Sequence, residues 1–157
     1  MTEARVTRVI GVDPGTTTGI AVVEFTSGQD PFLLLGRQLP WDPAAVAVFG
    51  QVELAARYRP SVAVCEAYTL TSRSAQRGQS GAEDAMEMNG VVRYACLLYG
   101  VDFAPRQKSA SKKAATDASL KAAGLWQRGK PHVNDAIRHC LVYGMRKRLF
   151  DLTVMVP

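Results

Sequence analysis

Two short apolar segments of this chain each end in a carboxylate, and together they restrict the folds that the chain can adopt. The first lies within Arg8–Val23 (RVIGVDPGTTTGIAVV), where a strand-like run leads to Asp13 and a turn rich in glycine and threonine. The second is Ser61–Glu66 (SVAVCE). Both have the nearly continuous apolar character of buried central strands. A buried strand that carries an acid to a tight turn favours a metal or phosphate site over a purely structural element.

The first forty residues predict a meander of three strands. Val6–Val12 is followed by a turn in which proline fixes one dihedral and glycine allows a sharp reversal. The second strand, Ile20–Phe25, is therefore expected to return antiparallel. Another turn over residues 27–31 precedes a third strand over Phe32–Leu39.

A helix between Pro43 and Tyr58 is predicted to connect this meander to the segment that ends in Glu66, because apolar residues recur there at helical spacing. A strand, a crossover helix and a strand normally place the two strands in parallel. If the strands that end in Asp13 and Glu66 are neighbours in the sheet, their carboxyl ends lie about 5 Å apart.

The second half of the chain predicts one more strand and several helices. Residues 68–81 are polar and are expected to form a mobile loop next to the site. The elements expected after it are a helix over Ala82–Tyr99, a short strand over Val101–Ala104, an alanine-rich helix over Ser111–Ala123, and a last helix over Pro131–Leu149.

Composition excludes several classes of protein. With 157 residues, of which 47% are hydrophobic, the chain fits a single domain over residues 1–157 that can bury a core. No apolar run approaches the roughly 18 residues of a membrane span, and no N-terminal signal pattern is visible. The three cysteines form no C-x-x-C pair and are interpreted as reduced thiols of a cytoplasmic protein: Cys65, Cys96 and Cys140.

Charge is distributed unevenly along the chain. Residues 1–66 carry a net charge of −2, whereas residues 67–157 carry +7, which accounts for the total of +5. Such asymmetry is expected when one part of a protein contacts a polyanion. Arg73 and Arg77, in the polar segment after Glu66, are candidate contacts to such a polyanion.

A third acidic segment lies at the start of the last predicted helix. His132 and Asp135 are three residues apart and therefore share one face of that helix. Together with Asp13 and Glu66 they form a set of oxygen ligands with one imidazole, which suits Mg²⁺ or Mn²⁺ better than zinc. Two such ions can clamp a phosphodiester and activate the attacking water. His139, seven residues after His132, is interpreted as mainly structural.

The pieces GVDPGTTTG, AVCE and HVNDA, in this order, resemble the RuvC family of Holliday-junction resolvases within the RNase H-like nuclease superfamily. The resemblance covers nearly the whole chain. It implies an α/β RNase H-like fold with a mixed five-stranded sheet in the order 3-2-1-4-5, flanked by helices. It also implies Mg²⁺-dependent cleavage of four-way or otherwise branched DNA by a homodimer, with two ions per active site. Asp13, Glu66 and Asp135 match the acidic positions of the family.

The chain departs from the family pattern in two places. His132 stands where many members have a fourth acid, an exchange that removes one charge and favours Mn²⁺. Tyr68 is the nearest candidate for the aromatic wedge of the family, in altered spacing. Basic residues ahead of the last helix hold phosphate in the family, and the residues in the matching region here are Lys108, Lys112 and Lys113.

Three alternatives remain open from the sequence. The D-x-G-T-T-x-G pattern also resembles the first phosphate loop of actin-like ATPases, although a chain of this length leaves little room for their second lobe and a nucleotide cofactor is not expected. A YqgF-like nuclease of the same superfamily would act on RNA. A catalytically inactive DNA-binding scaffold is disfavoured by the intact acids. Short, divergent chains of the RuvC kind often come from bacteriophages, which would place the protein in the host cytoplasm.

Overall fold

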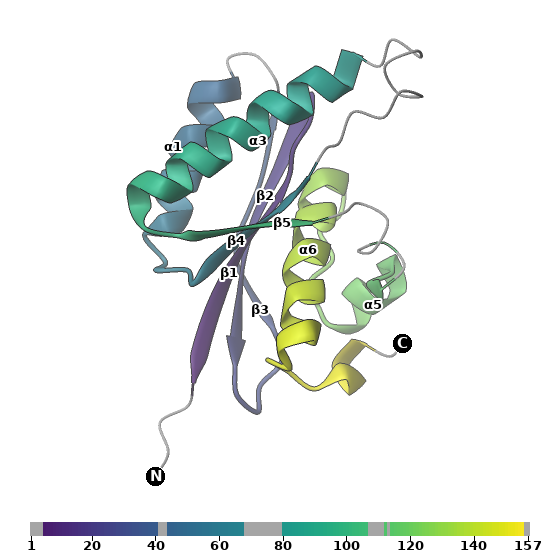
Figure 1. Ribbon diagram of the computed structural model, residues 1–157. Helices are drawn as coiled ribbons and strands as arrows, with labels where there is room; N and C mark the ends of the chain where they lie inside the picture. The colour runs from purple at the N-terminus through teal and green to yellow at the C-terminus, as the bar shows by residue number, and fades with distance from the viewer. Residues whose placement is uncertain (1–4, 41–43, 68–79, 107–111, 113, 156–157) are drawn as a thin grey trace.

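A five-stranded mixed sheet lies at the centre of the protein (Figure 1). The computed structural model describes residues 5–40, 44–67, 80–106, 112 and 114–155. The strand order is β3-β2-β1-β4-β5, which confirms the fold class expected from the sequence. The strands are β1 (Val6–Asp13), β2 (Thr17–Thr26), β3 (Phe32–Pro40), β4 (Val62–Glu66) and β5 (Asp102–Arg106).

Strand β1 connects the antiparallel and the parallel parts of the sheet. It pairs antiparallel with β2 on one side and parallel with β4 on the other. Val12 is in register with Cys65, so the residues that follow them, Asp13 and Glu66, end adjacent parallel strands. The predicted neighbourhood of the two acids is therefore confirmed.

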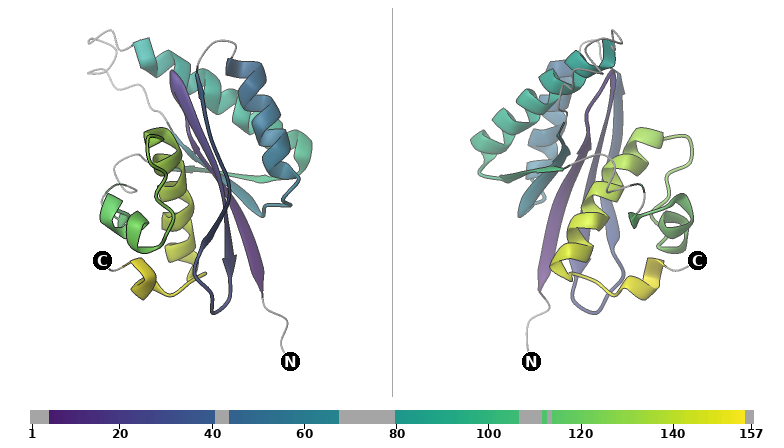
Figure 2. Two further views of the ribbon diagram at one scale, coloured as in Figure 1. Left: turned by 180° about the vertical axis from the view of Figure 1, so that it is seen from behind. Right: turned by 45° about the vertical axis from the view of Figure 1, so that its right-hand side comes forward.

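Helices cover both faces of the sheet (Figures 1 and 2). On one face lie α1 (Ala44–Ala56) and α3 (Ser80–Tyr99), and on the other lies α6 (Pro131–Lys147), accompanied by α5 (Asp117–Ala122) and the 3₁₀ helix η1 (Leu152–Met155). Among the described residues, no helix is both long and apolar enough to cross a membrane.

Side chains of β1 alternate between two hydrophobic cores, as the period of a strand requires. Val9 belongs to the core under α6, where it packs with Ile137 and Leu141. Ile10 and Val12 belong to the core under α1 and α3. Both faces of β1 are buried, which accounts for the continuous apolar run seen in its sequence.

Glycines let α6 approach the sheet closely. A Cβ atom built at Gly11 would lie 2.0 Å from the carbonyl oxygen of Ala136, and one built at Gly19 would lie 2.0 Å from that of His132. Real Cβ atoms do not approach backbone oxygens so closely, so neither position accepts a side chain unless the helix moves. These glycines therefore set the distance at which the first turns of α6 lie above β1 and β2.

One predicted helix, Ser111–Ala123, is wrong in extent. Residues 112 and 114 are helical, but Ala115 and Thr116 interrupt the helix and α5 begins anew at Asp117. The cause is local, because the Thr116 side chain accepts a hydrogen bond from the Ser119 amide at 3.2 Å and so caps a new helix. The expected polar loop falls largely on residues 68–79, outside the described residues.

We expect Gly19→Ala to lower the free energy of unfolding by about 1–3 kcal/mol, because the added methyl group overpacks the contact with α6. Gly50→Ala is the matched control, since Gly50 lies in α1 and a Cβ there would meet nothing within 4 Å. The control should gain about 0.5–1 kcal/mol from improved helix propensity. Urea denaturation measures both changes, and equal stabilisation of the two variants would contradict the close packing of α6.

Candidate metal centre

The candidate site lies where β1 and β4 end side by side. Asp13 is 5% exposed and Glu66 is 4% exposed, so both carboxylates are removed from bulk water. Burial of two like charges at one place is unfavourable unless a proton, a cationic partner or a metal ion offsets their repulsion. The two buried carboxylates therefore indicate a functional site rather than an ordinary part of the core.

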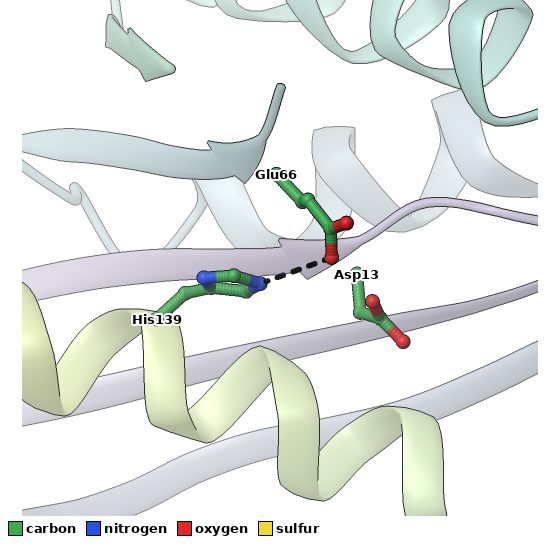
Figure 3. A group of neighbouring side chains, drawn as sticks. All are labelled: Asp13, Glu66 and His139. Atoms are coloured by element: carbon green, nitrogen blue, oxygen red, sulfur yellow. Dashed lines mark ion pairs between the residues drawn. The ribbon is translucent and has the colours of Figure 1, made fainter. Parts of the chain in front are cut away.

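A histidine from α6 completes this cluster. Asp13, Glu66 and His139 each offer one ligand atom, and these three atoms lie within 4.8 Å of one another. Figure 3 shows the His139 ring directed at Glu66, with Asp13 beside them, and His139 Nε2 lies 3.9 Å from Glu66 Oε2. His139 was interpreted from the sequence as mainly structural. The signal that could have identified it is its spacing, since it lies on the same helix stripe as His132.

His132 is held against Asp13 by contacts on either side of Gly19. Asp13 and Gln38 are the two register partners of Gly19 on the neighbouring strands. The backbone amide of His132 donates to Gln38 Oε1 at 3.2 Å, and its ring Nδ1 lies 2.8 Å from Asp13 Oδ2. His132 and Asp13 are therefore in direct contact through their side chains, and the role of His132 as a metal ligand stays a prediction.

Asp135 does not join the cluster of Asp13, Glu66 and His139. Its carboxylate instead contacts two cations, Arg138 on the same helix and Lys112, whose Nζ lies 3.0 Å from Asp135 Oδ2. Its role as a metal ligand stays a prediction.

Helix α3 holds both acidic strand ends from the opposite side. The Asn89 side chain donates to the backbone carbonyl of Glu66. Thr16, in the turn after Asp13, hydrogen-bonds to Asp84 at 3.0 Å. The two acids are thus placed by backbone that is tied down on both faces of the sheet.

The donor set fits a divalent cation. Two carboxylates and one imidazole are ligands that Mn²⁺ and Mg²⁺ accept, and they would neutralise an ion of charge +2. Without an ion, two carboxylate oxygens within 4.8 Å of each other repel by at least roughly 3 kcal/mol at an effective dielectric of 20. Cys65 is a poor candidate for a further ligand, because its side chain belongs to the core under α1 and α3. Burial, reinforced by the charges of Cys96, Glu66 and Asp13, also raises the pKa of this thiol well above its usual value.

Most of the residues predicted to contact DNA lie outside the described residues: Tyr68, Arg73, Arg77, Lys108 and Lys113. Lys112 is described, and its ammonium group pairs with Asp135 rather than standing alone in solvent.

Comparison with known proteins finds similar structures but no matching family model or curated sequence. No protein-family model matches the sequence, and no curated protein matches it significantly. A structure of T. thermophilus RuvC in complex with a Holliday junction substrate matches with a TM-score of 0.71 at 22% identity, covering 90% of this chain and 95% of that one. A Thermus thermophilus RuvC structure matches with a TM-score of 0.70, also at 22% identity, covering 90% of this chain and 97% of that one. The chain has a RuvC-like fold.

The RuvC-like fold explains why distant segments meet at one place. Its central strands end together, and its last helix crosses them with His132 and His139 on the side that faces the sheet. The three sequence pieces that suggested the resemblance supply Asp13, Glu66 and the neighbouring His132, whereas His139 lies three residues beyond the last piece.

We expect Mn²⁺ to stabilise this RuvC-like domain through the buried cluster. At an ion concentration of 100 times Kd, the gain is about 2.7 kcal/mol, which corresponds to a rise in Tm of roughly 5–10 °C for a domain of this size. Asp13→Asn should abolish the rise, whereas Asp30→Asn, at an exposed turn residue, should keep it. Differential scanning calorimetry with and without the ion measures the effect, and an unchanged rise in Asp13→Asn would exclude Asp13 as a ligand.

Proposed function

We propose that this protein is a metal-dependent endonuclease that cuts four-way junctions or other branched DNA. The observation that carries the proposal is the buried cluster of Asp13, Glu66 and His139 at the ends of two parallel strands in a RuvC-like fold. Carboxylates brought together in this way are the usual means of holding the divalent ions that hydrolyse phosphodiesters.

The residues of the chain have distinct proposed roles. Asp13 and Glu66 hold Mg²⁺ or Mn²⁺, with His139 as a third donor and with His132 and Asp135 as the further ligands that two ions would require. When bound, such ions polarise the phosphodiester and activate water for attack. Burial keeps bulk water away from Asp13 and Glu66, which strengthens their attraction for a cation.

His132 fixes the orientation of Asp13 and extends toward the surface. Its ring contacts Asp13 Oδ2 at 2.8 Å, while its side chain is 40% exposed. The ring is therefore placed between the buried carboxylate and the solvent from which a substrate arrives. It is suited to hold a proton at Nδ1 toward Asp13.

Charge supports DNA as the substrate. The part of the chain after residue 66 has a net charge of +7, and a phosphate backbone is the polyanion that such a surface attracts. Branched DNA in particular is supported by the bound junction in the T. thermophilus RuvC structure. A homodimer acting in the cytoplasm of a cell or phage host would present two such sites to the two strands that must be cut.

We expect cleavage of a synthetic four-way junction in the presence of Mg²⁺ or Mn²⁺. Asp13→Asn and Glu66→Gln should each lower the cleavage rate by at least a hundredfold, because each removes a proposed metal ligand, while junction binding survives. Asp30→Asn is again the control, since its side chain is at an exposed turn. Cleavage and gel-shift assays measure the two properties separately.

A panel of junction, fork, flap, linear duplex and RNA tests the substrate class in the same assay. Equal cutting of all DNA forms would leave a nuclease without selectivity for branches, and preferential cutting of RNA would replace the proposal by an RNA-processing one. Full activity of Asp13→Asn would overturn the assignment of the active site.

His132→Asp is expected to shift the metal preference toward Mg²⁺. The substitution replaces an imidazole by a carboxylate, and Mg²⁺ binds oxygen ligands more readily than nitrogen ligands. The ratio of cleavage rates in Mg²⁺ and Mn²⁺ should therefore rise relative to wild type. An unchanged ratio would count against His132 as a ligand and would leave it as a partner of Asp13 alone.

A further inference from the structure

The two oxygens of the Asp135 carboxylate are held by cations of different character. Arg138 contacts Oδ1, and Lys112 lies 3.0 Å from Oδ2. Both contacts belong to the region beside the buried cluster rather than to the cluster itself. Whether either cation can leave the Asp135 carboxylate depends on its burial and on its other contacts.

Arg138 is a fixed partner. Its side chain is 7% exposed, and its Nε donates to the carbonyl oxygen of Ala115 at 2.8 Å. A further contact joins it to Asp117 in the first turn of α5. Moving this guanidinium away from Asp135 would also strain its buried hydrogen bond to Ala115 and its contact with Asp117.

Lys112 is an exchangeable partner. Its side chain is 57% exposed, and a surface ion pair of this kind contributes only about 0–1 kcal/mol. A phosphate group that approached from solvent could replace the carboxylate as the partner of the ammonium group at little cost. Oδ2 of Asp135 would then be the uncovered oxygen.

Asp135 is close enough to the cluster to bind a metal ion there once Lys112 has left its Oδ2 atom. It lies three residues after His132 and four before His139 on α6, so its Cβ is about 5–6 Å from theirs. The acids Asp13 and Glu66 match the charge of one divalent ion, whereas the charge of Asp135 is offset by its own cations.

We propose that Asp135 is a reserve metal ligand whose availability is controlled by Lys112. While Lys112 covers Oδ2, the cluster binds a cation without Asp135. When a DNA phosphate takes Lys112, Oδ2 becomes available and the site gains a further negative ligand. The inference rests on the proposed nuclease function and adds a coupling between substrate contact and metal binding.

The test is Mn²⁺ affinity measured without DNA, by isothermal titration calorimetry on the whole chain. Lys112→Met should lower the Kd for Mn²⁺ by about two- to fivefold, the range expected from an exposed ion pair. Lys147→Met is the matched control, because it removes the same charge at the other end of α6. Lys147 lies about 18 Å along the helix from Asp135, which is beyond the Debye length of about 8–10 Å. The Lys147→Met variant should therefore bind Mn²⁺ with the same Kd as wild type.

A double-mutant cycle shows whether the effect passes through Asp135. In an Asp135→Asn background, Lys112→Met should no longer change the Kd for Mn²⁺. If the gain persists there, Lys112 acts through its general field and the inference is overturned. If Lys112→Met leaves the Kd unchanged in the wild-type background, the inference is likewise overturned.

DNA binding tests the exchange itself. Lys112→Met should reduce the slope of log K against log salt by about one unit, as expected for the loss of one phosphate contact, and an unchanged slope would overturn the exchange. These outcomes are separate from failure of the nuclease proposal. A chain that cleaves junctions but shows no effect of Lys112→Met on Mn²⁺ affinity contradicts this inference alone. A chain that neither binds Mn²⁺ nor cleaves DNA contradicts both.

Discussion

The close packing of α6 against bare backbone at Gly11 and Gly19 determines the geometry of the site. At both positions, the space that a side chain would need is filled by a carbonyl oxygen of the helix. This contact brings the first turns of α6 down to the ends of β1 and β4, where Asp13 and Glu66 lie. A helix held farther away by a layer of side chains would leave His132 and His139 out of reach of these acids.

Much of this arrangement was predictable from the sequence, because it follows from local patterns. The apolar runs before Asp13 and Glu66 indicate buried strands, and the helix between them indicates that the strands are parallel. Proline at the first position of α6 marks the start of the helix, and the observed helix begins there. The strand order came from the family resemblance rather than from these patterns.

The parts that were missed depend on particular side-chain contacts, some local and some between distant segments. The break at Thr116 needed a side-chain cap to outweigh the helix propensity of an alanine-rich run. Helical spacing places His139 on the stripe of His132, but whether its ring reaches Glu66 depends on how closely α6 approaches the sheet, which periodicity does not give. The pairing of Asp135 with Lys112 joins residues from different elements, and no spacing rule indicates it.

The position of Asp13 at the end of the central strand has a consequence for the motions of the site. Because β1 is hydrogen-bonded to a strand on each side, its amides should exchange with solvent only when the whole domain opens. The short helix α5, which anchors Arg138 through Asp117, has six residues and far fewer interactions to protect it. One side of the site is thus built on the central strand of the sheet, whereas the other depends on a short helix. Local opening of α5 would therefore change the surroundings of Asp135 and leave Asp13 and Glu66 in place.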